Sequence, residues 1–374
     1  MKSRIWVNAC EASGDMHGAA LMREMRALRP ELAFEGIGGP SMASLGQEQM
    51  YEMAALSLVG ATEVLSSLPR ILRMFKAIKR RLREQPPEAL ILIDAPDFNF
   101  RLARMAHGLG IPVYYYISPQ VWAWRSGRVK FLQKYCRKVL CILPFEQEFY
   151  SERGVDVEFV GHPLLDELPL AELDALERDP WRIGILPGSR KKEIAALLPE
   201  FAATAGQLVK EFPELKFIVV RAPGVELERL QALWPENVPV EYVDPDERYR
   251  AMAGCAFLLA SSGTATLEAA LLGTPCVVGY KMSGLSMFLA RRLVNVEHIS
   301  LPNLILGRKV FPELLQDEVS PEVMVPLAKA WLTDGEALEG VRLALRELRQ
   351  RMGEPGAPGR AARAIVESMR EEAG

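Results

Sequence analysis

Short apolar runs alternate with helix-length amphipathic segments, and this alternation restricts the fold of the chain more than any other feature. Nine runs are too short for a helix and are bounded by turn residues, which predicts strands at residues 5–9, 89–93, 113–117, 139–143, 183–186, 217–221, 238–242, 256–260 and 276–280. Strands and helices in this order form βαβ units around parallel sheets. We therefore expect doubly wound α/β domains.

The chain has 374 residues, which suits two domains better than one. A composition shift between residues 161 and 181 places the boundary, so we expect a first domain at 1–166 and a second at 167–345. A helical extension over 346–374 is able to pack back on the first domain. Ligands bind at the carboxyl ends of strands in such sheets, so we expect a cleft between the domains that carries the chemistry on its loops.

Charge and cysteine content exclude several functions. The formal net charge of -3 argues against a nucleic-acid partner. The five cysteines are odd in number and lie mostly in apolar segments, which indicates core residues in a reducing compartment. The first ten residues lack the long apolar core of a secretion signal, and no run of 18 apolar residues follows. We expect a cytoplasmic protein.

The strongest local motif follows the strand at 256–260 and opens a short helix. Its small residues, Ser262, Gly263 and Thr264, would let backbone N–H groups and hydroxyls reach a diphosphate at the helix N-terminus. Glu268, one turn further on, is placed to accept hydrogen bonds from a ribose diol. The alternative is an ordinary helix start with a solvent-facing glutamate.

A second loop follows the strand at 183–186 and is also suited to bind phosphate at a helix N-terminus. Gly188 permits close backbone approach, Ser189 follows it, and Arg190 offers a guanidinium fork to phosphate oxygens or to a leaving group. Read by itself, the loop is equally well a solvated basic turn. Two such loops in one domain favour a nucleotide.

Two carboxylates follow the strand at 89–93. Asp94 is placed to act as general base on a hydroxyl nucleophile, and Asp97 is better suited to cap the following helix. A structural turn aspartate is the alternative for Asp94. No third carboxylate or histidine lies nearby in the sequence, so we expect no metal and no other cofactor.

Weaker signals surround these loops in the first domain. The run containing Glu11, Ser13 and Asp15 precedes an expected helix at 17–28, as a ligand loop or a plain helix cap would. Residues 36–40 form a glycine-rich turn pattern, and residues 114–124 could line an acceptor groove or fill the core. His162, at the domain boundary, either faces the cleft or has a structural role.

Residues 69–83 carry seven cations and no acidic residue. Apolar side chains fall on one face of the predicted helix, so the segment either covers the sheet or lies on an anionic bilayer. The residues expected to face the membrane are Leu68, Leu72, Arg73, Phe75 and Lys76.

Taken together, the motifs resemble the lipid-A-disaccharide synthase family over residues 5 to 318. The segments that carry the resemblance are residues 11–15, 93–99, 118–125, 143–146, 186–190, 262–264 and 300–304. The resemblance implies two Rossmann-like domains in the GT-B arrangement and an inverting, metal-independent transferase. It joins a UDP-2,3-diacylglucosamine donor to a 2,3-diacylglucosamine 1-phosphate acceptor through a β-1,6 linkage.

The resemblance further implies that Asp94 and Arg190 are essential and that Glu268 and Asn303 serve the donor site. It implies work at the anionic cytoplasmic face of the inner membrane; a homo-oligomer is left open. Cys10 departs from the family, which has glycine there, and so questions any need for a positive φ at that position. Two alternatives remain: another UDP-sugar enzyme on the same fold, such as an epimerase, and a catalytically silent nucleotide-sugar-binding protein.

Overall fold

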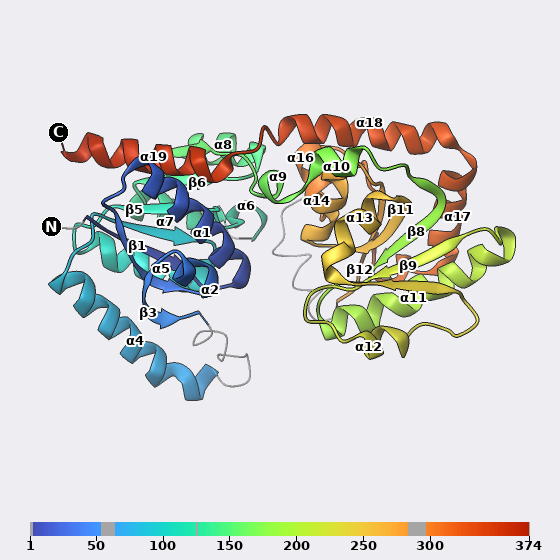
Figure 1. Ribbon diagram of the computed structural model, residues 1–374, viewed down its shortest axis with the longest axis horizontal. Coiled ribbons are helices and arrows are strands. Elements are labelled where there is room, and N and C mark those ends of the chain that lie inside the picture. Colours follow the sequence, from blue (N-terminus) through green and yellow to red (C-terminus); the bar gives the residue numbers. More distant parts are fainter. Residues whose placement is uncertain (1–2, 54–63, 125, 283–296, 374) are drawn as a thin grey trace. The chain divides into compact units, whose positions relative to one another are not determined.

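The computed structural model describes residues 3–53, 64–124, 126–282 and 297–373, in two compact units (Figure 1). The first unit comprises Met1–Asp166 and Glu354–Gly374, and the second comprises Glu167–Gly353. Each unit is an α/β structure with its own parallel sheet, as the alternation of apolar runs predicts.

The sheet of the first unit has seven parallel strands in the order β3-β2-β1-β4-β5-β6-β7. The strands are β1 (Arg4–Ala9), β2 (Ala33–Gly38), β3 (Glu48–Glu52), β4 (Ala89–Ile93), β5 (Val113–Tyr116), β6 (Lys138–Cys141) and β7 (Val157–Phe159). β1 and β4 lie side by side at the centre, with Val7 opposite Ile91. The order runs in opposite directions from this pair, as it does in a doubly wound sheet.

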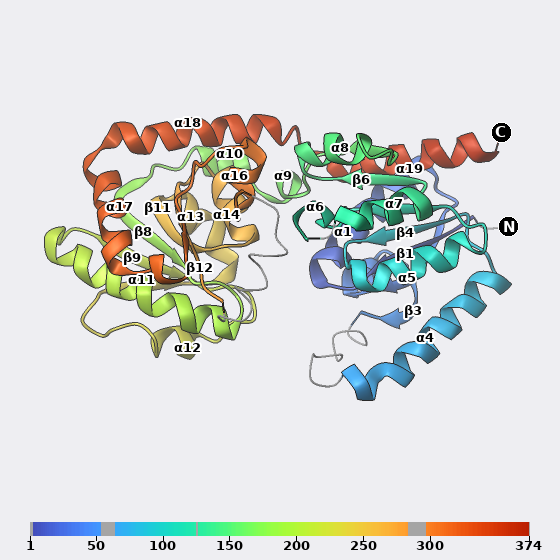
Figure 2. The same ribbon diagram turned by 180° about the vertical axis from the view of Figure 1, so that it is seen from behind.

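Helices cover both faces of this sheet. They are α1 (Ala12–Leu28), α2 (Pro40–Ser44), α4 (Val64–Glu84), α5 (Pro96–His107), α6 (Val121–Trp124), α7 (Val129–Tyr135), α8 (Pro144–Ser151) and α19 (Ala357–Ala373). Successive residues of β1 point to opposite faces, so Ile5 and Val7 pack with α1 and α19 while Trp6 packs with α4, α5 and α7. Figure 2 shows α4, α5 and α7 along one side of the sheet.

The sheet of the second unit repeats this plan with six parallel strands in the order β10-β9-β8-β11-β12-β13. The strands are β8 (Asp179–Leu186), β9 (Lys216–Val220), β10 (Val240–Val243), β11 (Cys255–Ser261), β12 (Cys276–Tyr280) and β13 (Glu313–Leu315). The central pair is β8 with β11, and Leu259 lies opposite Ile185.

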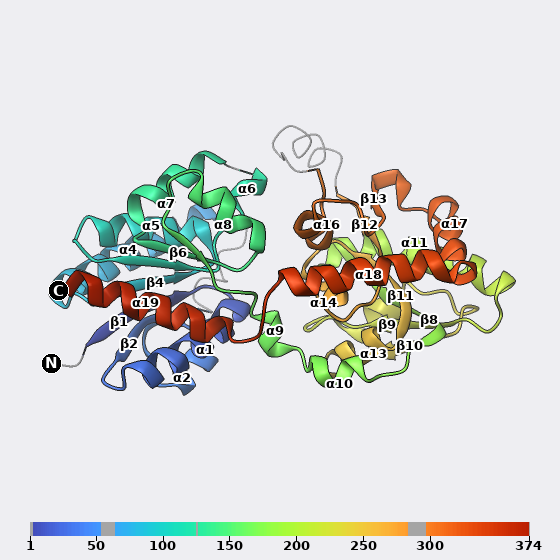
Figure 3. The same cartoon turned by 90° about the horizontal axis from the view of Figure 1, so that it is seen from above.

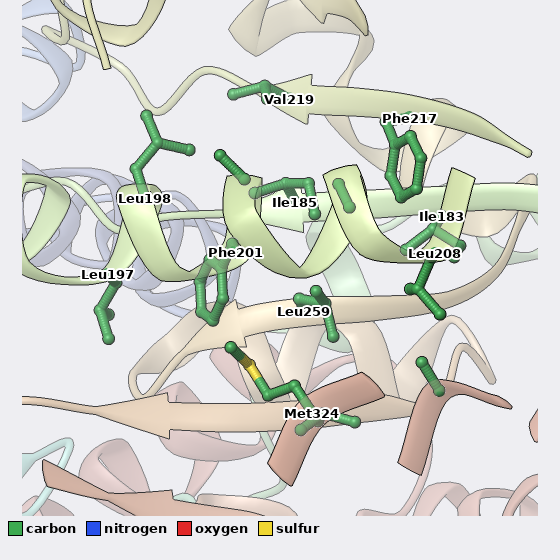
Figure 4. Close-up of a cluster of buried hydrophobic side chains, with 14 of the residues drawn as sticks. Ile183, Ile185, Leu197, Leu198, Phe201, Leu208, Phe217, Val219, Leu259 and Met324 are labelled. Carbon is green, nitrogen blue, oxygen red and sulfur yellow. The ribbon is translucent and has the colours of Figure 1, made fainter. Parts of the chain in front are cut away.

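Two layers of helices enclose the second sheet as well. α9 (Leu164–Glu167) spans the boundary between the units, and the others are α10 (Leu170–Asp174), α11 (Lys191–Glu211), α12 (Leu227–Gln231), α13 (Arg248–Ala253), α14 (Thr264–Leu271), α16 (Leu301–Leu306), α17 (Pro321–Thr333) and α18 (Gly335–Arg351). Figure 4 shows α11 running along the strands, with Phe201 packed among Ile185, Leu259 and Met324. α14 and α18 pack against each other, as Figure 3 shows from above.

The nine predicted strands are confirmed to within a few residues, and four strands were missed: β2, β3, β7 and β13. β2 contains residues 36–38 of the pattern interpreted as a glycine-rich turn, and this interpretation is wrong for these three residues. Gly36 has φ 143°, and a Cβ at this position would lie 2.2 Å from the Val7 carbonyl oxygen. The glycine is required by close strand pairing, not by a turn.

The C-terminal extension begins later than residue 346. α18 continues to Arg351, and the chain then turns at Gly353 and Gly356, which have φ values of 81° and 100°. α19 packs against α1, and its Ile365 is fully buried in the core of the first unit. Of the helices in the described ranges, none is long and apolar enough to cross a bilayer.

Candidate functional site

Four loops of interest follow the two central strand pairs. The loops after β1 and β4 begin at Cys10 and Asp94, and those after β8 and β11 begin at Pro187 and Ser262. Parallel strands end at the same edge of a sheet, and the order reverses at each central pair. A crevice for ligands opens at this point in doubly wound sheets.

The backbone at the end of β4 adopts an uncommon conformation. Asp94 and Ala95 both have positive φ, at 45° and 43°. Such values cost free energy for residues other than glycine and persist only where neighbouring groups hold the backbone. Asn99 on α5 donates from Nδ2 to the carbonyls of Ile93 (3.0 Å) and Asp94 (2.7 Å). Tyr115 donates its hydroxyl to the same Asp94 carbonyl at 2.6 Å.

A second buried amide holds Asn99 in place. Asn8 on β1 donates from Nδ2 to Oδ1 of Asn99 at 2.6 Å, and both side chains are fully buried. The two central strands therefore fix the Asp94 turn together. Sequence reasoning missed the roles of Asn8 and Asn99, although an asparagine inside an apolar strand was a signal.

The Asp94 carboxyl sits in a partly desolvated place. Burial raises its pKa above the usual range, and the charge of Glu11 adds to the shift. A raised pKa makes the ionised carboxylate a better proton acceptor near neutral pH. Cys10 has no positive φ and its side chain lies 3.5 Å from Asn8, so this position does not need a glycine in this chain.

A cavity of about 540 Å³ opens beside Asp94 in the first unit. It lies at the ends of β4, β5 and β6 and is lined by Asp94, Pro96, Asp97, Ile117, Ser118, Pro119, Gln120, Val121, Arg128, Ile142, Leu143 and Glu146. Residues 117–121, interpreted as an acceptor groove or core, thus form one wall. Arg125 and the side chains of residues 123, 124 and 126 lie outside the described residues.

Glu146 is a buried carboxyl in the same cavity that sequence reasoning did not single out. It accepts hydrogen bonds from the Trp122 indole at 2.9 Å and from the backbone N–H groups of Ile142 and Leu143. Burial raises the pKa of Glu146 to about 7, against the opposing effect of these donors. Its contacts tie the start of α8 to the 117–122 wall, so we interpret Glu146 as a positioning residue.

Asp97 does not cap α5, contrary to the prediction. Ala95 is the N-cap residue, and Asp97 lies in the first turn with its side chain 88% exposed. It forms an ion pair with Arg128 at 2.9 Å. The left-handed turn at Asp94 starts the helix two residues earlier than the sequence pattern indicated.

Asp15 has a structural role that the sequence did not reveal. α1 begins at Ala12, not at residue 17, so Ser13 and Asp15 lie within its first turn; Glu11 and Ser13 are exposed. The buried Asp15 carboxylate accepts the backbone N–H groups of Gly39 (2.7 Å), Ser41 (2.8 Å) and Met42 (3.1 Å). It therefore caps the short helix α2.

His162 is buried and accepts a hydrogen bond at Nδ1 from the Leu164 backbone at 3.2 Å. Burial lowers the pKa of His162 to about 3, and the nearby His17 contributes. The imidazole is therefore neutral at physiological pH. Of the two alternatives, the contacts support the structural one.

In the second unit, β11 leads into α14 through Ser262 and Gly263. Gly263 is the N-cap residue of α14 and has no side chain with which to cap this helix. A Cβ at Gly263 would meet no atom of the described residues within 4 Å, so the described part of the chain leaves the space above the helix start open. Thr264 is exposed in the first turn. Uncapped N–H groups at an open helix N-terminus suit an anion.

Glu268 lies one turn into α14 and is partly desolvated. Tyr249 donates its hydroxyl to Oε1 at 3.2 Å, and Arg248 contacts the Tyr249 hydroxyl at 2.7 Å. Burial raises the pKa of Glu268, while Arg248 opposes the shift. The carboxylate keeps acceptor capacity for a ligand hydroxyl.

The loop after β8 has fewer unpaired backbone N–H groups than the sequence suggested. Gly188 has φ 102°, and Glu193 Oε2 accepts the backbone N–H groups of Ser189 (3.2 Å) and Arg190 (3.5 Å). These N–H groups, expected to meet a phosphate, are therefore already paired. The Arg190 side chain remains exposed. Of the carboxylates in the described ranges, none lies within ion-pair distance of Arg190, so its guanidinium is available to an anion.

Asn303 makes only internal contacts. Its Nδ2 donates to the Phe311 carbonyl (2.9 Å) and to Glu313 (2.8 Å), and its Oδ1 accepts the backbone N–H groups of Val310 and Phe311. These four bonds fill the capacity of an amide side chain. The side chain is also fully buried, so we interpret Asn303 as a positioning residue.

A chain of hydrogen bonds through Glu313 connects Asn303 with the Ser262 loop. Glu313 accepts the Ile299 and Ser300 backbone N–H groups at 3.1 and 2.9 Å and the Ser300 hydroxyl at 2.6 Å. Ser262 in turn donates its hydroxyl to the Ile299 carbonyl at 3.4 Å. Sequence reasoning missed Glu313, because the glutamate of a short edge strand carries no motif.

The residues of the basic helix α4 that were expected to face a membrane differ in their exposure. Leu72 is 59% exposed, and Arg73 and Lys76 are exposed beside it. Phe75 is only 9% exposed and stacks on Phe98 of α5 at 4.8 Å between ring centroids, so the expectation that it faces lipid is wrong. The helix needs this face for the sheet. The Leu68 side chain lies outside the described residues.

Within the described ranges, no group of three or more histidine, cysteine, aspartate or glutamate residues is placed to hold a metal ion. The anion-accepting features of the second unit are backbone N–H groups at α14 and the Arg190 guanidinium. Both can neutralise negative charge without a metal.

Solved structures of other proteins share the fold of this chain. UDP-GlcNAc 2-epimerase from Neisseria meningitidis, bound to UDP-GlcNAc, matches with a TM-score of 0.63 at 13% identity, over 99% of this chain and 100% of that one. The calicheamicin glycosyltransferase CalG4 matches with a TM-score of 0.61 at 16% identity, over 100% of both chains. The fold is therefore the GT-B arrangement of two Rossmann-like domains.

Comparison of sequences places the chain within this class. The family model described as lipid-A-disaccharide synthetase matches residues 5–352. The lipid-A-disaccharide synthase of Myxococcus xanthus is 40% identical over 375 residues, covering 98% of this chain and 97% of that protein. The enzyme of Geobacter sulfurreducens is 40% identical over 373 residues, with the same coverage.

The chain belongs to the lipid-A-disaccharide synthase family. It is a glycosyltransferase of lipid A disaccharide synthesis, as the resemblance of its motifs predicts. Neither the epimerase nor the silent binding protein is favoured as an alternative.

Replacement of Asn303 tests its positioning role. Asn303→Ala leaves the part-buried N–H group of Val310 and the buried N–H and carbonyl groups of Phe311 without their partner, and each unsatisfied buried group costs about 1–3 kcal/mol. We expect the free energy of unfolding of the ligand-free protein to fall by at least about 2 kcal/mol in urea denaturation. Ser262→Ala, a replacement in the neighbouring half-buried loop, is the control and should change it far less. Unchanged stability of Asn303→Ala would instead assign the residue to direct ligand contact.

Proposed function

We propose that the chain transfers a 2,3-diacylglucosamine unit from its UDP conjugate to the 6-hydroxyl of 2,3-diacylglucosamine 1-phosphate. UDP is released and a β-1,6 bond forms. The support is family membership over nearly the whole length of the chain, together with the Asp94 turn at the end of β4. The substrates follow from the resemblance to the family, and the residues follow from the local geometry.

The proposed reaction is a single displacement. The acceptor oxygen attacks the anomeric carbon of the donor, its proton passes to the Asp94 carboxylate, and the bond from that carbon to the diphosphate breaks. The bonding electrons leave with UDP. Attack and departure on opposite sides of one carbon invert its configuration.

Asp94 suits the role of base because of its surroundings. Its backbone is held by Asn99 and Tyr115, and its carboxyl lines the cavity beside β4 with a raised pKa. A base held in one orientation removes the proton without first having to be ordered. Acid–base groups of this kind typically contribute about 10² to 10⁴ in rate.

The second unit supplies the donor site in this proposal. Ser262, Gly263 and Thr264 offer the open start of α14 to the diphosphate, and Glu268 accepts the ribose hydroxyls. Arg190, held by the turn at Gly188 and Ser189, stabilises the charge that develops on the departing diphosphate. No metal takes part. Asn303 orders the Ser262 loop through Glu313.

We also propose that α4 holds the protein at an anionic membrane. Among the described side chains of this helix, Leu72 is the large apolar one that is exposed, and Arg73 and Lys76 flank it. Cations beside an inserted apolar group are attracted to anionic headgroups. Phe75 supports the helix from the protein core.

Replacement of Asp94 and Arg190 tests the mechanism with both substrates at saturation. Asp94→Asn should keep UDP affinity and lose about 10²- to 10⁴-fold in kcat, with product measured by mass spectrometry of the lipid. Arg190→Ala should lose kcat and bind UDP more weakly. Near-normal kcat in Asp94→Asn would remove Asp94 as the base.

The stability of Asp94→Asn is the control that separates a loss of catalysis from a loss of folding. Burial raises the pKa of Asp94 in the folded protein above its unfolded value, so the Asp94 contribution to stability is present in acid and lost as the pH rises. Asp94→Asn, which also tolerates positive φ, should therefore gain stability relative to the parent at neutral pH. A melting temperature that fell at neutral pH would show that the rate loss reflects unfolding.

A chelator tests whether the transfer depends on a metal. We expect EDTA to leave the transfer rate unchanged, because the proposed site neutralises the diphosphate with Arg190 and backbone N–H groups. A rate abolished by EDTA and restored by Mg²⁺ would be the contrary outcome.

Liposome sedimentation tests the membrane proposal. Binding to anionic vesicles should weaken in Leu72→Ser and weaken further as salt rises, because charges are screened over about 8 to 10 Å at physiological ionic strength. Leu343→Ser, which removes another large exposed apolar side chain from the second unit, is the control. Binding indifferent to salt and to Leu72→Ser would exclude α4 as the contact.

A further inference from the structure

A second cavity, of about 420 Å³, lies next to the Asp94 cavity in the first unit. Its lining residues are Pro96, Asp97, Phe100, Arg101, Arg104, Gly127, Arg128 and Phe131. Pro96, Asp97 and Arg128 line both cavities, so the two spaces share a wall. The second cavity lies over α5 and α7, whose positions Figure 2 shows.

Three arginines make the second cavity strongly cationic, and aromatic rings hold them. Arg128 lies 5.3 Å above the Phe100 ring, and Arg104 lies 5.6 Å above the Phe131 ring. Arg101 lies 5.7 Å above the Phe75 ring. Guanidinium groups stacked on rings lose less freedom when they bind a ligand.

Two of these arginines have no carboxylate partner in the part of the chain that the structure describes. Arg128 is paired with Asp97, whereas no described carboxylate lies within ion-pair distance of Arg101 or Arg104. The two are one helical turn apart on α5 and therefore point to the same side. Their charges are available to an external anion.

The adjoining cavities have opposite character. Both cavities share the ion pair of Asp97 with Arg128. Beyond this pair, the first contains the carboxyl groups of Asp94 and Glu146, and the second contains the guanidinium groups of Arg101 and Arg104. A ligand with a hydroxyl at one end and an anion at the other would therefore bind in one orientation, with its hydroxyl in the first cavity and its anion in the second. Its anion is repelled from Asp94 and attracted to Arg101 and Arg104.

We propose that Arg101 and Arg104 bind the phosphate monoester of the acceptor sugar, with Arg128 completing the site at the shared wall. The proposal rests on the function proposed above, in which the acceptor carries its reacting hydroxyl and its phosphate at opposite ends of one hexose. Phosphate bound over α5 leaves the hydroxyl end of the sugar in the cavity that contains Asp94. Forked guanidinium groups match phosphate oxygens in geometry as well as charge.

The test compares two acceptors, 2,3-diacylglucosamine with and without its 1-phosphate, in neutral detergent micelles free of anionic lipid. In Arg101→Gln/Arg104→Gln, kcat/KM for the phosphorylated acceptor should fall roughly 10- to 100-fold, mainly through KM. For the acceptor without phosphate, the parent and the variant should be equal. Affinity for UDP should be unchanged.

Lys130→Gln/Lys134→Gln is the matched control. It also removes two exposed cations, from α7, and neither lysine lines the two cavities. The control should retain the kcat/KM of the parent for both acceptors. An equal loss in both double variants would overturn the proposal in favour of a general charge effect, and melting temperatures check that both are folded.

The remaining outcomes separate this inference from the proposed function. A parent protein that transfers nothing to either acceptor would contradict the proposed function. A parent that is active, with an arginine variant equal to it on the phosphorylated acceptor, would overturn this inference alone. The alternative ligand for Arg101 and Arg104 is the phosphate headgroup of a bilayer phospholipid. Loss of anionic-liposome binding in the arginine variant, with unchanged kcat/KM in micelles, would assign the arginines to headgroups and overturn the acceptor site.

Discussion

Parallel pairing at two central strand pairs, β1 with β4 and β8 with β11, is the constraint on which the rest of the structure depends. All neighbouring strands run in the same direction, so every loop that follows a strand emerges at one edge of its sheet. The reversal of strand order separates the flanking helices at that edge. Asp94 in the first unit, and Ser262 and Arg190 in the second, owe their location to this arrangement.

The N-termini of α11 and α14 in the second unit differ in whether their backbone N–H groups are already hydrogen-bonded. At α11, Glu193 accepts two N–H groups of the loop, and the Arg190 side chain is exposed. At α14, Gly263 provides no cap and leaves open space. One start therefore offers a charged side chain and the other offers backbone donors. A diphosphate can use both kinds of contact.

Buried amides hold the Asp94 turn and the Ser262 loop, the two segments to which the proposed reaction assigns the base and the diphosphate site. Asn8 and Asn99 hold the left-handed turn at Asp94, and Asn303 with Glu313 orders the segment that contacts Ser262. Such networks resist distortion because an unmatched buried polar group costs more than an exposed one. The essential positions of a site of this kind thus extend beyond the residues that touch ligand.

The sequence by itself determined the βαβ plan, nine of the strands and the loops that matter, because buried parallel strands appear as short apolar runs that turn residues bound. It also carried the family, since the motifs stand in order along the chain. It could not reveal β2, where Gly36 is needed only because the Val7 carbonyl lies against it. Strand β13 is too short to show a pattern.

Only the tertiary structure decided which polar residues are free to react. Asp15, Asp94 and Asp97 all lie in the first turn of a helix or just before it. One caps α2, one lines a cavity, and one pairs with Arg128 in solvent. Likewise, Leu72 and Phe75 share the apolar pattern of α4, yet one is exposed and the other is packed on Phe98. The role of a side chain depends on the partners that distant segments bring to it, and local sequence carries no record of them.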